Sequence, residues 1–187
     1  NGAMTFVDNM SVDGTLRHAR VLINGNCTGS PEQTAILTFQ LTRAIGQLLG
    51  LDWSQANEPA SYPDELAGWP LMHPNNQRCN LSFGYCMPDQ TTLRFDDVAA
   101  LSRLYPVTTA NAGNLPGKLL TALTTVAIHG TISFADGQGM EGVNVVVRPL
   151  LPGTSQTDWR YSVSAVSGAT FHGQNANPVN GTVDPDG

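Results

Sequence analysis

Residues 43–54 read Arg43-Ala44-Ile45-Gly46-Gln47-Leu48-Leu49-Gly50-Leu51-Asp52-Trp53-Ser54, and this stretch decides the fold. Its first part ends a predicted helix that starts after Ser30, a helix-capping residue type, with Pro31 in its first turn. Apolar residues recur at helical spacing on one face, and polar residues form a stripe on another. The apolar face comprises Leu37, Leu41, Ala44 and Leu48, and the polar stripe Gln33, Gln40, Arg43 and Gln47. Gly50 is expected to end the helix after Leu49 in a left-handed conformation.

Two further elements are predicted on either side of this helix. Residues 15–23 (TLRHARVLI) alternate between polar and apolar types and lie between Asp-Gly and Asn-Gly turn signals, which is typical of a strand. Residues 95–105 favour a second helix, because Asp96 and Asp97 suit the positive end of the helix dipole and Pro106 ends it. Residues 54–93 form a long, irregular connection rich in Pro and Asn. These elements indicate an α+β fold.

The pattern at residues 43–54 resembles the zinc helix of the matrixin branch of the metzincin metalloproteases, written HExGHxLGLxHS. In that pattern three His bind Zn²⁺ and the Glu activates the zinc-bound water. Three other segments resemble matrixin landmarks in the family's order: the edge strand at residues 20–24, the Met-turn at residues 70–74 (PLMHP) and the closing helix at residues 95–105. The resemblance covers residues 15–106. It implies a metzincin-like α+β domain with a mixed sheet, a zinc-helix equivalent, a Met-turn containing Met72 and a closing helix.

The residues that carry the chemistry of that family are replaced in this sequence. Arg43 stands at the first zinc His, Ala44 at the catalytic Glu, Gln47 at the second His and Trp53 at the third. A guanidinium has no lone pair for a metal, an amide oxygen is a weak zinc ligand and an indole only donates. Because Ala44 also removes the general base, the sequence predicts no catalytic residue, no metal and no cofactor. Gly50 and Met72 match the family pattern, as expected if the fold was retained after catalysis was lost.

The replaced positions leave two structural questions open. Arg43 either fills the space of the lost cation, held by Asp52 or another carboxylate, or belongs to an exposed polar stripe. Trp53 either plugs the former cleft or offers an aromatic surface to a ligand. If Arg43 replaces the metal, Arg43→Ala should lower the melting temperature by several degrees.

The organisation of the chain changes after residue 107. Residues 1–107 are predicted to be a partial matrixin-like domain, residues 108–125 a linker, and residues 126–187 a partial β-sandwich. Strands are expected at residues 126–134, 143–149 and 159–166, and residues 119–125 either continue the linker or lead into the first strand. Residues 137–142 fit GxGxxG but precede a β-branched run, so a hairpin connection is expected. Residues 128–145 resemble the start of a carboxypeptidase-regulatory-like domain, an Ig-like or prealbumin-like sandwich.

Cysteine usage and composition bear on the compartment. Cys79 and Cys86 are separated by six residues rich in turn formers and are candidates for a disulfide, which leaves Cys27 buried, free or paired outside the chain. Only 13% of the residues are charged, about half the roughly 25% of ordinary domains. The net charge of −6 without a basic cluster argues against nucleic-acid binding, and no apolar run reaches the length of a membrane span. A secreted or cell-surface location is therefore expected.

These observations predict a secreted, catalytically inactive metalloprotease-like protein that acts as an extracellular binding, adhesion or structural scaffold component. Its partner would be a protein, the extracellular matrix, a cell surface or a second copy of itself. One alternative is a zinc metallopeptidase-related protein whose site is completed outside this chain or by unforeseen ligands. Another is an exported regulator that keeps a substrate-like groove and competes for peptides.

Overall fold

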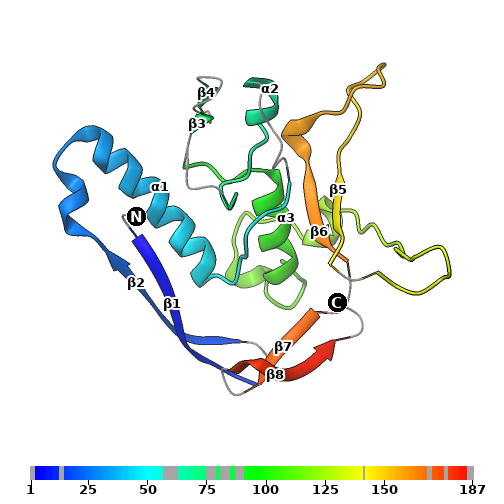
Figure 1. Cartoon of the computed structure of the whole chain (residues 1–187), viewed down its shortest axis with the longest axis horizontal. Helices are drawn as coiled ribbons and strands as arrows, with labels where there is room; N and C mark the ends of the chain where they lie inside the picture. Colours follow the sequence, from blue (N-terminus) through cyan, green and yellow to red (C-terminus); the bar gives the residue numbers. More distant parts are fainter. Residues whose placement is uncertain are drawn as a thin grey trace.

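Helices and two-stranded sheets alternate along the chain (Figure 1). The structure, a computed structural model, describes residues 3–12, 15–56, 63–74, 79–80, 85–86, 91–140, 142–167, 170–174 and 177–184. The described strands are β1 (Ala3–Met10), β2 (Leu16–Ile23), β3 (Cys79–Asn80), β4 (Tyr85–Cys86), β5 (Asn144–Val147), β6 (Val163–Val166), β7 (Thr170–Gln174) and β8 (Asn177–Asp184). The described α-helices are α1 (Pro31–Leu48), α2 (Pro63–Leu66), α3 (Phe95–Leu104) and α4 (Thr121–Thr124). The predicted α+β class is confirmed.

Helix α1 has the predicted bounds and caps. The Ser30 hydroxyl accepts a hydrogen bond from the Gln33 amide at 3.2 Å, and Pro31 occupies the first turn. At the other end Gly50 adopts a φ of +87°. The Gly50 amide donates to the Gln47 carbonyl and the Leu51 amide to the Gly46 carbonyl, each at 3.0 Å, which is the Schellman arrangement. The chain therefore reverses at Gly50 and carries residues 51–54 back beside the helix.

The β1–β2 hairpin lies along α1 (Figure 1). The predicted strand at residues 15–23 is confirmed as β2, and its partner β1 was not predicted. The Thr5 hydroxyl donates to the Ala44 carbonyl at 3.2 Å and so joins β1 to the helix. Among the described strands every pair is antiparallel and joins neighbours in sequence. The short connections within the β1–β2, β3–β4 and β7–β8 pairs allow only that direction. The mixed sheet implied by the resemblance is not among them.

Helix α3 confirms the predicted second helix, but its acidic first turn does more than complement the dipole. Asp96 and Asp97 are both buried. Asp97 accepts a hydrogen bond from the amide of Arg94, the N-cap residue, at 2.8 Å. At the far end the Tyr105 hydroxyl donates to the Leu49 carbonyl at 2.8 Å. The two long helices are thus tied together where both end.

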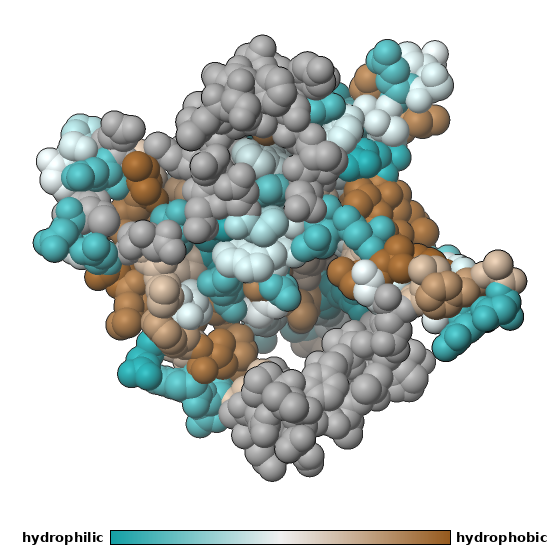
Figure 2. Space-filling view, in the orientation of Figure 1, coloured by the Kyte–Doolittle hydropathy of each residue, from teal (hydrophilic) through white to brown (hydrophobic). Residues whose placement is uncertain are grey.

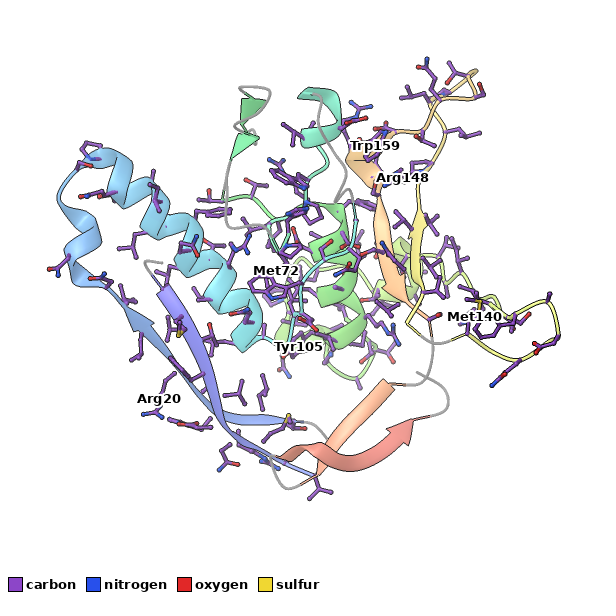
Figure 3. All side chains as sticks on the ribbon, viewed as in Figure 1. Arg20, Met72, Tyr105, Met140, Arg148 and Trp159 are labelled. Carbon is purple, nitrogen blue, oxygen red and sulfur yellow. The ribbon has the colours of Figure 1, made fainter. Side chains whose placement is uncertain are left out.

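A small buried cluster lies where residues 63–74 meet α1. Its fully buried members are Phe39, Leu66, Trp69 and Leu71. Trp159, in the 3₁₀-helix Trp159–Tyr161 before β6, packs against this cluster. Its position, close to Arg148 at one end of the β5–β6 hairpin, is labelled in Figure 3. Residues far downstream therefore complete the core around residues 63–74.

The second part of the chain only partly follows the prediction. β5 and β6 fall within two of the predicted strands, but they pair with each other. The hairpin connection predicted at the glycine-rich segment was therefore wrong, and among its described residues only a tight turn forms, in which the Phe134 amide donates to the Gln138 carbonyl at 2.8 Å. The prediction of a strand at residues 126–134 was wrong, since only the bridge between Ser133 and Gly139 forms there. A strand needs a partner to complete its ladder, and an alternating pattern alone does not supply one.

The segment after α3 is a closed loop. The Val107 amide donates to the Thr121 hydroxyl at 2.8 Å, and the Thr121 amide donates to the Val107 carbonyl at 2.9 Å. Residues 121–124 form the short helix α4, so the alternative of a lead-in strand at residues 119–125 was wrong. The predicted division into residues 1–107, 108–125 and 126–187 stays a prediction, and residues 185–187 lie outside the described part of the chain.

Candidate functional site

The two outer zinc-ligand positions of the matrixin pattern are in contact. The Arg43 guanidinium lies over the Trp53 ring at 4.7 Å from the ring centroid and over the Phe39 ring at 5.1 Å. Its Nη1 donates to the Leu71 carbonyl at 3.2 Å. Arg43 is only 2% exposed, so the expectation of an exposed polar stripe was wrong at this position. The Arg43 side chain is thus buried on the face of α1 that contacts Trp53 and Leu71.

The buried cation is balanced by a carboxylate, and this carboxylate is not Asp52. Burial lowers the pKa of the Arg43 guanidinium to about 10, and the negative charge of Asp97 opposes the shift. Arg43 therefore stays charged at neutral pH. Asp52 is exposed, and its Oδ1 accepts a hydrogen bond from the Trp53 amide at 2.7 Å. The charge that acts on Arg43 is thus that of Asp97 and not that of Asp52, and the replacement of a metal by Arg43 stays a prediction.

Asp97 also fixes the turn at residues 70–74. Its carboxylate accepts hydrogen bonds from the Leu71 amide at 2.8 Å and the Met72 amide at 3.0 Å, in addition to the Arg94 amide. Burial raises the pKa of this carboxyl, and the three amide hydrogen bonds oppose the rise. The turn at residues 70–74 is therefore held on the first turn of α3 by one side chain.

Met72 lies against the helix at its only glycine. It is 2% exposed, and a Cβ placed on Gly46 would lie 2.6 Å from the Met72 Sδ. The Met72 carbonyl accepts a hydrogen bond from the Ser54 amide at 2.9 Å. Figure 3 labels Met72 near the centre of the fold. Met72 can therefore pack this closely against α1 because residue 46 is a glycine.

The remaining positions of the pattern are placed differently. Ala44 is buried, and its carbonyl is the acceptor for Thr5 on β1. Gln47 is half-buried one turn after Arg43. Trp53 is 37% exposed, so part of its side chain is accessible to solvent. In the described residues no three His, Cys, Asp or Glu side chains are grouped as a metal site would require.

His73 is a buried residue whose role the sequence did not reveal. It is 4% exposed, and its ring lies 4.3 Å from the Trp69 ring, centroid to centroid. Burial, with a smaller effect of the Arg43 charge, lowers the His73 pKa to about 4. The only hint in the sequence is its place between Met72 and Pro74 in an otherwise apolar turn. His73 is therefore neutral at physiological pH and adds no second cation beside Arg43.

The pKa of His73 predicts an acid-sensitive fold. The unfolded chain binds a proton near pH 6.5 and the folded chain only near pH 4, so stability is complete above about pH 6.5 and falls as the pH drops to about 4. The loss is about 2–3 kcal/mol. Urea unfolding of wild type and His73→Phe at intervals from pH 7.5 to 4 measures it. The stability advantage of wild type over the variant should shrink across this range, and a constant difference would contradict the assignment.

A second buried carboxylate joins the two parts of the chain. Asp96 accepts hydrogen bonds from the Ser54 hydroxyl and from Ser164 on β6, whose amide lies at 2.6 Å and whose hydroxyl lies at 3.0 Å. A cleft of about 160 Å³ lies beside it, between residues 51–55, α3 and β6. The carboxylates of Asp96 and Asp97 at this cleft already accept hydrogen bonds from the protein itself. The cleft thus lies at a junction between three segments of the chain.

The cysteine prediction is only partly within the described structure. The backbones of Cys79 and Cys86 are directly opposite each other in the β3–β4 pair. Opposed residues of an antiparallel pair have Cα atoms about 4.5–5.5 Å apart, within the range that a disulfide spans. The side chains of both residues, and that of Cys27, lie outside what the structure describes. The disulfide stays a prediction.

Nothing among models of known families, curated proteins or solved structures matches this chain. The likeness of residues 15–106 to a metzincin and of residues 128–145 to a carboxypeptidase-regulatory-like domain therefore stays a prediction from sequence motifs. None of the helices in the described residues has the length and apolar character needed to cross a bilayer.

Proposed function

We propose that this chain is a secreted, catalytically inactive matrixin-like protein that serves as an extracellular binding or scaffold component. The observation that carries the proposal is the stacking of Arg43 on Trp53 at 4.7 Å. In the alignment with the matrixin pattern these residues replace the first and third zinc ligands. A permanent internal cation then takes the place of a bound one.

The chemistry of these positions supports the absence of catalysis. A guanidinium offers no lone pair to a metal, and its charge repels a divalent cation. Ala44 provides no carboxylate to activate water, and its carbonyl is engaged by Thr5. Met72 packs under Gly46 as a Met-turn would pack under a zinc helix. The scaffold is thus kept while each group needed for hydrolysis is replaced.

The surface supports a binding role. Figure 2 shows apolar residues gathered over the β5–β6 hairpin and the segment before it. Exposed members include Val147, Leu150 and Val166. Contiguous apolar patches on the surface of a protein are typical of sites that bind a partner. Low lysine content and the closely spaced Cys79 and Cys86 support an extracellular setting.

Metal content and cleavage test the inactive state. Purified protein is dialysed against a zinc solution and then against zinc-free buffer, and its zinc content is measured by elemental analysis. In a separate assay, cleavage of a broad set of quenched fluorescent peptides is measured with and without a chelator. We expect far less than one zinc per chain and no chelator-sensitive cleavage. Stoichiometric zinc with cleavage would overturn the proposal and favour a peptidase-related protein with unforeseen ligands.

Restoring the ligands tests the alignment itself. The variant Arg43→His/Ala44→Glu/Gln47→His/Trp53→His places the family's pattern on α1 and the turn after Gly50. If the alignment is correct, this variant gains one tightly bound zinc per chain, because residues 43 and 53 already converge. The matched control keeps Trp53 and should bind zinc far more weakly. A folded four-residue variant, verified by circular dichroism, that binds no more zinc than this control would contradict the resemblance.

Binding is tested directly on defined extracellular ligands. Wild-type protein is passed over immobilised fibrillar collagen, fibronectin, laminin and the chain itself in a surface plasmon resonance experiment. We expect saturable binding to one matrix protein or to the chain itself. A Leu150→Asp/Val166→Asp variant tests the apolar surface over β5–β6 as the contact. Absence of binding to every surface would count against the scaffold role.

A further inference from the structure

Residues 126–131 form the part of the described chain with the fewest interactions. In the described structure their main-chain and side-chain groups make no hydrogen bond, and the next contact is the Met140 amide donating to the Ile132 carbonyl at 2.9 Å. Val126 is 88% exposed and Ile128 71% exposed. The segment lies in the yellow stretch before β5 in Figure 1. Six consecutive residues thus offer both apolar side chains and open peptide groups to solvent.

The sequence of this segment is that of a strand. Residues 126, 128, 132 and 134 are Val, Ile, Ile and Phe, on one face of an alternating pattern with Gly130 between them. Branched apolar residues at every second position are typical of a strand with one buried face. An exposed segment with this pattern and unpaired peptide groups is a template for a strand from another chain. What is missing is a partner strand.

The segment is complementary to itself. In an antiparallel pair centred on His129, residue 126 opposes residue 132, residue 127 opposes residue 131 and residue 128 opposes residue 130. Val126 then meets Ile132 on the apolar face, and Ala127 meets Thr131 on the other. Between Lys118 and Asp136 the chain carries no charged residue, so two copies approach here without the repulsion that a net charge of −6 creates elsewhere.

We propose that residues 126–132 pair with the same residues of a second copy, forming a two-fold symmetric dimer through an antiparallel strand pair. A two-fold axis at His129 lets one surface serve both chains. Pairing would satisfy the open peptide groups and cover the exposed side chains of Val126 and Ile128. This proposal rests on the scaffold function proposed above and identifies a second copy of the chain as the partner.

The oligomeric state tests the proposal. Light scattering after gel filtration and sedimentation equilibrium are expected to give a mass that rises toward twice that of the chain as concentration increases. Ile128→Lys puts a charge into each apolar face and is expected to give a monomer at all concentrations. Leu22→Lys, at an exposed leucine on β2, is the matched control and should dimerise like wild type. A wild-type monomer throughout, or a dimer unaffected by Ile128→Lys, would overturn the proposal.

Cross-linking tests the register. In a background with Cys27→Ser, His129→Cys faces its own copy across the axis and is expected to form a covalent dimer on mild oxidation, reversible by reductant. Leu22→Cys, on β2 and away from the axis, should remain monomeric on the same gel. Equal cross-linking of the two variants would overturn the register. Zinc content and peptide cleavage do not depend on dimerisation, so failure here is distinguishable from failure of the inactive-protease proposal.

Discussion

Replacing Gly68 by alanine is expected to destabilise the protein more than any other single change considered. A Cβ at residue 68 would lie 1.8 Å from the Trp159 carbonyl oxygen and 2.8 Å from the Arg160 Cα. Both are backbone atoms, which cannot rotate away as a side-chain end can. The expected loss is at least about 3 kcal/mol, the upper end for overpacking substitutions. For a chain of this size that lowers the melting temperature by about 6–12 °C.

Thermal unfolding followed by circular dichroism measures this loss, with Gly113→Ala as the matched control. A Cβ at Gly113 meets nothing within 4 Å, so that variant should melt within about one degree of wild type. The comparison isolates the contact between residues 63–68 and the 3₁₀-helix Trp159–Tyr161. Equal melting temperatures for the two variants would show that these segments are not packed together in solution.

Replacing Arg43 by alanine is expected to have the second-largest effect. The change removes the stacking on Trp53 and Phe39 and the hydrogen bond to the Leu71 carbonyl, and leaves a buried cavity beside the charge of Asp97. Together these losses amount to about 3 kcal/mol. Arg43→Lys should lie between wild type and Arg43→Ala, because an ammonium group keeps the charge but lacks the planar face that stacks on an indole.

Urea unfolding measures these differences, and Arg103→Ala is the control. Arg103 is exposed in the last turn of α3, so its removal should change stability by less than about 0.5 kcal/mol. A double-mutant cycle between Arg43→Met and Trp53→Leu should give a coupling of about 1–2 kcal/mol if the stacked pair is formed. Stability unchanged by Arg43→Ala would contradict the view that an internal cation fills the former metal position.

Local signals predicted the two long helices. Ser30, Pro31 and Gly50 act within their own turns, so α1 could be bounded from the sequence, and Pro106 did the same for the end of α3. The turn that begins the glycine-rich segment, closed by the Phe134 amide on the Gln138 carbonyl, also has a local cause, although the strands predicted on either side of it do not pair. These features are set by residues close in sequence, so they can be predicted without knowing which segments pack against them.

What could not be predicted depends on contacts between distant residues. Arg43 looked like part of a polar stripe, and only the return of the chain at Gly50 brings Trp53 over it. Asp97 looked like a helix-dipole residue, whereas its amide donors come from residues 71 and 72 as well as from its own N-cap. The strand expected at residues 126–134 failed for the same reason, since its pattern said nothing about a partner strand.

The adjacent carboxylates of Asp96 and Asp97 have a consequence for protein engineering. Asp97 holds the turn at residues 70–74, and Asp96 accepts its hydrogen bonds from Ser54 and from Ser164 on β6. In a chimera joined anywhere in residues 107–125, residues 1–107 would be followed by the sequence of another protein. The amide and hydroxyl of Ser164 would then be missing. The buried Asp96 would then lose two of its donors, at a cost of about 1–3 kcal/mol or more. Transplantation of residues 1–107 alone should therefore carry Asp96→Ser or Asp96→Asn as a compensating change.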